Sequence, residues 1–201
     1  QNHGHSGHRT TPQTFEQDAD DVAALMNHLG LTKADLLGFS NGGNTAMQIA
    51  MRHPEMVNKL VLASTFYKRE GFPPGFFEGM KQATINDMPQ SLKDAFLEIN
   101  PDHNSLLAMF TKDRDRMVQF KDWEDEAIRG IKAPALIMNG DRDVIHNGHA
   151  LAMANLMENS RLIILPSEHG GYIGVAESPA PLGNMVELVV EIISDFLSNR
   201  S

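Results

Sequence analysis

The pentapeptide Gly38-Phe39-Ser40-Asn41-Gly42 constrains the fold of this chain more than any other stretch. It follows the short apolar run 34–37 and precedes a helical stretch over residues 45–52, so the order is strand, abrupt turn, helix. A serine at the tip of such a turn projects its hydroxyl clear of the sheet, and a Cβ at either flanking glycine would collide with neighbouring chain. The pattern fits the G-x-S-x-G nucleophile elbow, although an ordinary glycine-rich turn can carry the same letters.

The rest of the chain alternates between apolar runs and amphipathic stretches. Residues 60–63, 135–138 and 162–165 are apolar without alternation, which is typical of strands covered on both faces. Helical periodicity predicts helices over residues 14–29, 45–52, 150–157 and 185–197. This order predicts an α/β fold built on a mostly parallel, doubly wound sheet.

One long segment interrupts the alternation. Between residues 66 and 130 no buried strand is evident, and helices are expected at 76–83, 91–99 and 106–117, separated by prolines. An insertion of this length is usually functional, often a lid over a site. We therefore expect a core formed by 1–65 and 131–201 and a helical cap formed by 66–130. The apolar side chains of the cap mostly serve its own packing, and Phe66, Phe76 and Met109 are the candidate substrate contacts.

Composition narrows the possible partners. A net charge of −9 over 201 residues argues against a nucleic-acid partner, because phosphate binding needs a basic face. With no cysteine there is neither a disulfide nor a thiolate zinc site, and His3, His5 and His8 lie in a polar loop without defined coordination geometry, so no metal is expected. No apolar run is long enough to span a bilayer and no signal peptide is visible, which favours a cytoplasmic protein. A homodimer is left open.

A nucleophilic serine needs a base, and the base needs an acid that holds it in one tautomer. In a parallel sheet these partners should follow apolar strands. The loop 139–143 contains Asp141 and Asp143, and the loop 166–170 contains His169. His146 and His149 are weaker alternatives for the base, because they precede a helix and are expected to be surface or cap residues. The resulting chain order is Ser, Asp, His.

With these motifs the chain resembles the α/β-hydrolase superfamily, in particular its lid-bearing esterase-like and enol-lactonase-like branch. The resemblance assigns Ser40 as nucleophile, Asp143 of Gly140-Asp141-Arg142-Asp143 as acid and His169 as base. Asp141 would then orient its loop by hydrogen-bonding the backbone. No cofactor is implied.

The family's G-H-G-x-S/T loop is similar to Asn2-His3-Gly4-His5-Ser6, with asparagine in place of the first glycine. In the family, further strands precede that loop and one supplies the first oxyanion donor. We therefore expect an N-terminally truncated enzyme in which Leu36 and Leu37 lie on an open apolar edge. The Asn41 backbone N–H is then the one assignable oxyanion donor, and the fragment is expected to be poorly active.

The expected function is hydrolysis of a small-molecule carboxylic ester or lactone through an acyl-enzyme. The same triad would serve carbon–carbon hydrolysis of a diketone or perhydrolysis of an acid, and a non-catalytic ligand-binding protein could retain the fold. A dehalogenase is disfavoured, because such enzymes carry aspartate where this chain has Ser40.

Overall fold

The computed structural model describes residues 2–175, 178 and 182–199, and the chain divides into two compact units. The sheet unit consists of Phe15–Pro73 and Lys121–Ser201, and the helical unit of Gln1–Thr14 and Pro74–Phe120. The three helices expected for the cap lie in the helical unit. Residues 1–14, which the sequence analysis grouped with the core, are in the same compact unit as those helices.

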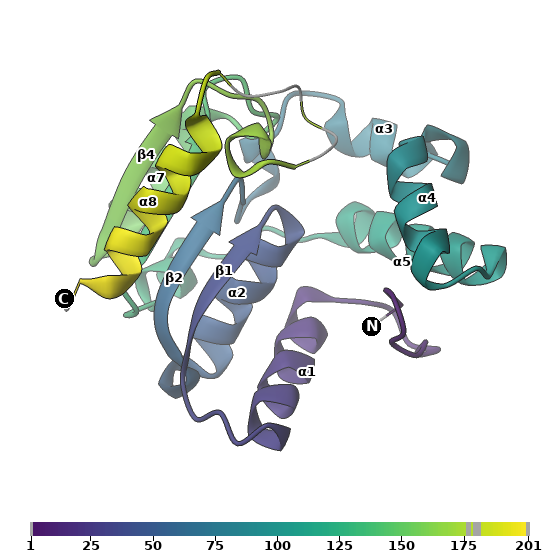
Figure 1. Cartoon of the computed structure of the whole chain (residues 1–201), viewed down its shortest axis with the longest axis horizontal. Coiled ribbons are helices and arrows are strands. Elements are labelled where there is room, and N and C mark those ends of the chain that lie inside the picture. Colours follow the sequence, from purple (N-terminus) through teal and green to yellow (C-terminus); the bar gives the residue numbers. More distant parts are fainter. Residues whose placement is uncertain (1, 176–177, 179–181, 200–201) are drawn as a thin grey trace. The chain divides into compact units, whose positions relative to one another are not determined.

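The sheet unit is built on four parallel strands (Figure 1). They are β1 (Ala34–Phe39), β2 (Val57–Ala63), β3 (Ala135–Gly140) and β4 (Ser160–Leu165), in the order β1-β2-β3-β4. Phe39 pairs with Ala63, and Ala63 pairs with Met138, so the carboxyl ends of neighbouring strands are in register. The loops that follow these strands therefore emerge at one edge of the sheet, where ligands of open α/β sheets bind.

Helices cover both faces of this sheet, as predicted. The face that carries Leu60 and Leu62 packs on α2 (Asn41–Arg52) and α7 (Asn147–Leu156), and the face that carries Val61 and Ala63 packs on α8 (Met185–Ser198). Because successive side chains of a strand point to opposite faces, a strand covered on both sides must be apolar throughout. The helices of this unit are α1 (Phe15–His28), α2 (Asn41–Arg52), α6 (Asp125–Arg129), α7 (Asn147–Leu156) and α8 (Met185–Ser198), with 3₁₀ turns at Pro54–Met56, Arg69–Gly71 and Gly171–Ile173.

In the described sheet β1 pairs only with β2. Leu37 is 54% exposed at this edge, in agreement with the expected apolar edge. Leu36 behaves differently, because it is half-buried and packs against the core cluster on the α2 face. Of the two leucines expected at the open edge, Leu37 is exposed there and Leu36 is packed against the core.

The helical unit contains α3 (Phe76–Gln82), α4 (Gln90–Ile99) and α5 (His103–Gln119), with a 3₁₀ turn at Ile85–Asp87. Its small core is formed by Phe96, Leu106 and Met109. Asp102 caps α5 by accepting hydrogen bonds from the backbone N–H groups of residues 104 and 105, which satisfies donors that a helix start leaves open.

The loop of residues 2–13 packs along α5. His8 Nε2 lies 3.0 Å from Ser105 Oγ, and Lys112 donates to the backbone oxygen of Arg9. His3 Nε2 lies 3.1 Å from a carboxylate oxygen of Asp113, a partner that the sequence analysis did not anticipate. These contacts attach the loop to the helix. Among the described residues, no group of three or more His, Cys, Asp or Glu is arranged to hold a metal ion.

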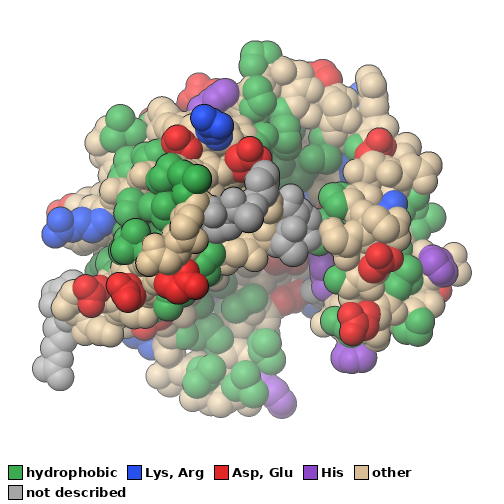
Figure 2. Space-filling model, turned by 45° about the horizontal axis from the view of Figure 1, so that its top comes forward, with side chains coloured by type: hydrophobic (Ala, Val, Ile, Leu, Met, Phe, Trp, Pro, Cys, Tyr) green, Lys and Arg blue, Asp and Glu red, His purple; other side chains and the backbone are tan. Residues whose placement is uncertain are grey.

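The face of the protein shown in Figure 2 carries more acidic than basic side chains. Asp and Glu side chains are spread over this face, in line with the net charge of −9. Within the described ranges, no helix has the length and apolar character needed to cross a membrane.

Candidate active site

Ser40 lies at the sharp turn between β1 and α2. Its backbone has φ +50° and ψ −121°, a region that a residue with a side chain rarely adopts. A Cβ at Gly38 would lie 2.4 Å from the backbone oxygen of Gly42, and one at Gly43 would lie 2.6 Å from Thr65 Cβ. At Gly42 an added Cβ would have no atom within 4 Å, so the expectation that this glycine avoids a collision was wrong. The chain approaches so closely at this turn that positions 38 and 43 require glycine.

Asp143 and His169 form a hydrogen-bonded pair. The carboxylate follows β3 and its side chain is fully buried, and the imidazole follows β4 and is 32% exposed. His169 Nδ1 lies 2.8 Å from Asp143 Oδ1, which also accepts from the Ile145 N–H at 3.0 Å. Asp143 Oδ2 accepts from Ser64 Oγ at 2.6 Å. Both carboxylate oxygens are therefore held.

The ionisation of Asp143 follows from these partners. Burial by itself raises the pKa of this carboxyl group, but the hydrogen bond and charge of His169, with hydrogen bonds from Ile145 and Ser64, outweigh it. The pKa of Asp143 therefore lies below its ordinary value, and the group is a carboxylate at neutral pH. A buried carboxylate beside imidazole Nδ1 fixes the tautomer in which Nε2 is free to accept a proton.

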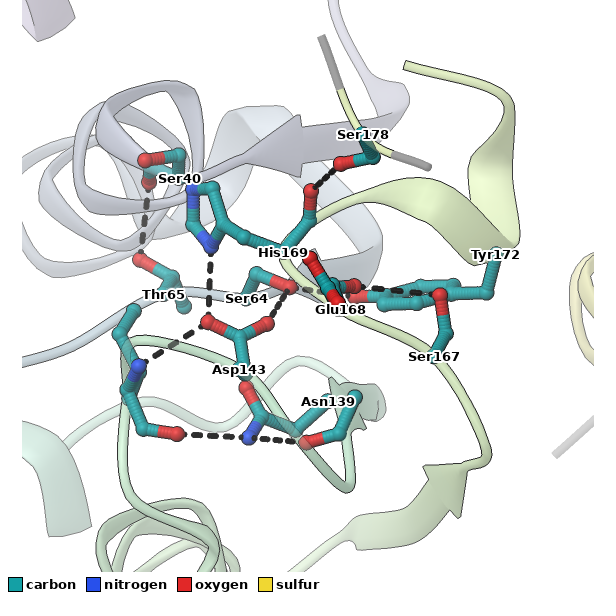
Figure 3. A network of polar contacts seen from close by, with 12 residues as sticks. Ser40, Ser64, Thr65, Asn139, Asp143, Ser167, Glu168, His169, Tyr172 and Ser178 are labelled. Atoms are coloured by element: carbon teal, nitrogen blue, oxygen red, sulfur yellow. Dashed lines mark hydrogen bonds and ion pairs between the residues drawn. The ribbon is translucent and has the colours of Figure 1, made fainter. Parts of the chain in front are cut away.

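The imidazole of His169 lies between Asp143 and Ser40 (Figure 3). Its ring packs at 4.8 Å, centroid to centroid, against the ring of Phe39, the residue before Ser40. Gly170 follows with φ +74°, and a Cβ there would lie 2.6 Å from Phe39 Cζ. The glycine thus allows the histidine loop to approach the elbow closely. Ser40, Asp143 and His169 are brought together by three loops at one edge of the sheet.

The alternative acid and bases take other places. Asp141 Oδ1 accepts from the Ser167 N–H at 3.0 Å, which is the loop-orienting contact considered for it. His146 is exposed. The expectation that His149 is a surface or cap residue was wrong, because its side chain is buried within α7 and its ring stacks on Tyr67 at 4.5 Å.

The predicted substrate contacts are distributed over both units. Phe66 lies in the sheet unit, is 1% exposed and contacts the rings of Phe15 and Phe72 edge-on. Phe76 is half-buried at the start of α3, and Met109 is buried in the small core of the helical unit. Their contact with a substrate stays a prediction.

Sequence reasoning missed three hydroxyl groups at this site. Ser64 and Tyr172 are linked to the acid, and Thr65 is linked to the elbow through the backbone oxygen of Ser40 (Figure 3). Their only sequence signal is that Ser64-Thr65 directly follows a buried strand, the position from which side chains reach the carboxyl edge of a parallel sheet. Tyr172 gave no signal of its own.

Several known proteins with a similar sequence or fold are named as hydrolases. Residues 1–92 match the family profile described as alpha/beta hydrolase fold. The chain is 32% identical over 144 residues to 2-hydroxymuconate semialdehyde hydrolase of Pseudomonas sp. strain CF600, covering 63% of this chain and 51% of that protein. It is 28% identical over 160 residues to the human serine hydrolase BPHL, covering 76% and 53% respectively. This chain therefore spans about half the length of these relatives.

The fold has a solved counterpart. The enol-lactonase from Burkholderia xenovorans LB400 superposes with a TM-score of 0.74 at 22% identity, covering 99% of this chain and 78% of that one. At this identity the likeness concerns the fold, a parallel sheet with helices on both faces. Taken with the sequence matches, it shows that the chain has the α/β-hydrolase fold and that its sequence is similar to members of the α/β-hydrolase superfamily.

Proposed function

We propose that this chain is a serine hydrolase that cleaves carboxylic esters or lactones. The observation that carries the proposal is the 2.8 Å contact between His169 Nδ1 and the buried Asp143, with the imidazole beside Ser40 (Figure 3). A carboxylate that holds one imidazole nitrogen leaves the other free to take the proton of a neighbouring hydroxyl.

The reaction would proceed in two steps. In the first, Ser40 Oγ attacks the substrate carbonyl carbon while His169 Nε2 takes its proton, and the imidazolium then protonates the leaving alcohol oxygen. In the second, His169 takes a proton from water, the resulting hydroxide attacks the acyl-enzyme, and the acid is released as Ser40 regains its proton. Asp143 stays ionised throughout and stabilises the imidazolium.

The negative charge that develops on the carbonyl oxygen needs hydrogen-bond donors. Asn41 is the first residue of α2, where backbone N–H groups have no acceptor inside the helix and the helix dipole favours an anion. We therefore assign the Asn41 N–H as an oxyanion donor. Each such donor is worth about a hundredfold or more in rate.

A second candidate reaction is carbon–carbon bond hydrolysis on the same triad. It is favoured by the relative named 2-hydroxymuconate semialdehyde hydrolase, which shares 32% identity over 144 residues. Perhydrolysis uses the same groups with hydrogen peroxide in place of water. The triad alone does not separate these reactions, because the nucleophile, base and acid are the same in each.

The first experiment is labelling of this chain with a fluorophosphonate probe, which reacts with activated serines. Ser40→Ala should lose labelling, and Ser91→Ala, an exposed serine of the helical unit, should keep it. Turnover of p-nitrophenyl esters, lactones and vinylogous diketones then identifies the preferred bond, with Ser40→Ala slower by about a thousandfold or more. A chain that takes no label while a control esterase does would refute the proposal. Binding of these compounds without turnover would favour a ligand-binding protein.

We further propose that the helices α3, α4 and α5 act as a substrate-selecting cap. Among the predicted contacts, Phe76 is the one that is neither fully buried nor part of the small core of the helical unit, and its ring contacts that of Phe77 edge-on at 5.2 Å, so its truncation disturbs packing less than truncation of Phe66 or Met109 would. Phe76→Ala should change KM across the ester panel and leave the rate of fluorophosphonate labelling within about twofold. Unchanged KM values for every ester would remove Phe76 from the substrate contacts.

A further inference from the structure

Two hydroxyl residues, Ser64 and Thr65, follow β2 at the edge of the sheet where the proposed triad assembles. Ser64 is completely buried, and Thr65 is 2% exposed. Ser64 has φ +50°, a left-handed backbone conformation that disfavours residues with a Cβ. The consecutive side chains bind different parts of the site (Figure 3).

Ser64 holds the acid. Its Oγ lies 2.6 Å from Asp143 Oδ2 and 2.8 Å from the hydroxyl of Tyr172. An ionised carboxylate can only accept, so the single hydroxyl hydrogen of Ser64 is donated to Asp143. The single hydroxyl hydrogen of Tyr172 is then shared between Ser64 Oγ at 2.8 Å and the Met138 backbone oxygen at 3.2 Å, and burial, which raises the pKa of Tyr172, keeps that hydrogen in place. The result is a chain of donors from Tyr172 through Ser64 to Asp143.

This chain completes the fixation of the carboxylate. Oδ1 is occupied by His169 and the Ile145 N–H, whereas Oδ2 is occupied by Ser64. With both oxygens held, the carboxylate plane cannot rotate about χ2, which is otherwise a soft torsion. The orientation of the imidazole depends on that plane.

Thr65 holds the elbow. The single hydrogen on its Oγ1 is shared between two acceptors, the backbone oxygen of Ser40 at 3.1 Å and Asn44 Oδ1 at 2.7 Å. Asn44 is completely buried in α2 and donates from Nδ2 to the backbone oxygen of Phe66 at 2.7 Å. The strained turn at Ser40 is thus tied through Thr65 and Asn44 to the same segment that holds Asp143.

We propose that Ser64 and Thr65 are a pair of positioning residues, in which the Ser64 hydroxyl orients Asp143 while the Thr65 hydroxyl fixes the Ser40 turn. Because they are adjacent in the chain, they set the separation between the acid and the nucleophile. The inference rests on the proposed hydrolase function.

The test compares variants that separate the hydroxyl groups from the backbone and from packing. Ser64→Ala and Ser64→Gly both remove the hydroxyl, but glycine also accepts φ +50° without strain. Thr65→Val keeps the shape of the side chain against Gly43, and Thr65→Ser keeps the hydroxyl. Ser160→Ala is the matched control, because its Oγ donates to the Ala154 backbone oxygen at 2.8 Å and touches none of the triad.

The readouts are the maximal rate of fluorophosphonate inactivation, the half-saturating probe concentration and the melting temperature. Loss of a hydrogen bond to a charged group should slow inactivation by about tenfold to a hundredfold in both Ser64 variants, and loss of a neutral one by about threefold to tenfold in Thr65→Val. The half-saturating concentration should stay unchanged. Thr65→Ser and Ser160→Ala should react within about twofold of wild type.

A second readout separates the two residues. The proton between His169 Nδ1 and Asp143 can be followed by proton NMR, and its resonance should shift in Ser64→Ala and stay in place in Thr65→Val. If folded Ser64→Gly is inactivated at the wild-type rate, or if the resonance is unmoved in Ser64→Ala, Ser64 does not act through Asp143. If Thr65→Val matches Thr65→Ser, the Thr65 hydroxyl has no positioning role. A wild-type chain that takes no label at all would instead refute the hydrolase proposal.

Discussion

His149 is a buried histidine outside the proposed triad, and its titration should limit the stability of the sheet unit in acid. The side chain is 6% exposed, and its Nε2 accepts a hydrogen bond from the Tyr67 N–H at 3.2 Å. Gly71 also packs closely against the ring, since an added Cβ there would lie 2.7 Å from Cδ2. A protonated imidazole would lose the Tyr67 hydrogen bond, because Nε2 would then carry a hydrogen of its own.

The expected size of the effect follows from the pKa. Burial, followed by the positive charge of Lys68, lowers the pKa of His149 from 6.5 to about 4, with Asp122 opposing the shift and His146 adding to it. The unfolded chain therefore binds a proton more readily than the folded one below pH 6.5. Stability is fully present above that pH and is lost as the pH falls toward 4, by at most about 3 kcal/mol, of which about 2 kcal/mol is lost between pH 7.5 and 5.

Urea unfolding at pH 7.5 and pH 5 tests this, followed by the fluorescence of Trp123, the single tryptophan. Trp123 reports on the same region, since its backbone N–H donates to the Tyr67 backbone oxygen at 2.9 Å. His149→Gln can still offer an acceptor to Tyr67 but does not titrate, so its unfolding free energy should fall by about 2 kcal/mol less than that of wild type. His28→Gln, at an exposed position of α1, is the control and should behave as wild type. Equal losses in wild type and His149→Gln would refute the argument.

Two further substitutions, each paired with a control, test contacts around the sheet. Gly38→Ala places a Cβ 2.4 Å from the Gly42 backbone oxygen and should lower the unfolding free energy by about 3 kcal/mol or more. Its control, Gly148→Ala in α7, has no atom beyond the neighbouring helix backbone within 4 Å of the added Cβ and should leave the unfolding free energy unchanged or raise it by about 0.5 kcal/mol. Coinciding urea titrations of the two variants would contradict this. Lys59→Met removes an ammonium group that donates to backbone oxygens at the C-terminus of α8. It should lower the unfolding free energy by about 1–3 kcal/mol and speed amide exchange in α8. Its control, Lys132→Met, loses only an ion pair with the exposed carboxylate of Glu158 and should have almost no effect.

Most elements of the sheet unit were predictable because burial on two faces leaves a direct mark on sequence. The apolar runs located β2, β3 and β4, and their alternation with helices predicted the parallel sheet. The starts of elements were harder. β2 begins at Val57, three residues before the run, because Asn58 and Lys59 interrupt the apolar pattern. Lys59 is nevertheless 6% exposed, since its ammonium group reaches the carbonyl groups at the end of α8.

The start of α7 was also difficult to predict from the sequence. The helix begins at Asn147, although Asn and Gly at its first two positions favour a loop by intrinsic propensity. Tertiary packing decides the matter, because His149 and Ala150 are buried. A sequence pattern that treats His149 as polar places it outside, whereas in the structure its ring stacks on Tyr67.

The residues of the candidate site likewise differ in how far the sequence could predict them. The loops that carry Ser40, Asp143 and His169 could be located because each follows an apolar strand, and the carboxyl ends of parallel strands meet at one edge. The choice of Asp143 over Asp141 came from the resemblance to the α/β-hydrolase superfamily. The hydroxyls of Ser64 and Thr65 follow β2 at the same edge, yet sequence cannot say which way either points. That direction is set by the positive φ of Ser64, which interrupts the strand alternation at the residue that must reach Asp143. The residues that follow β2 therefore determine the relative position of Asp143 and Ser40. That position is set only once the loops after β1 and β3 have folded against these residues.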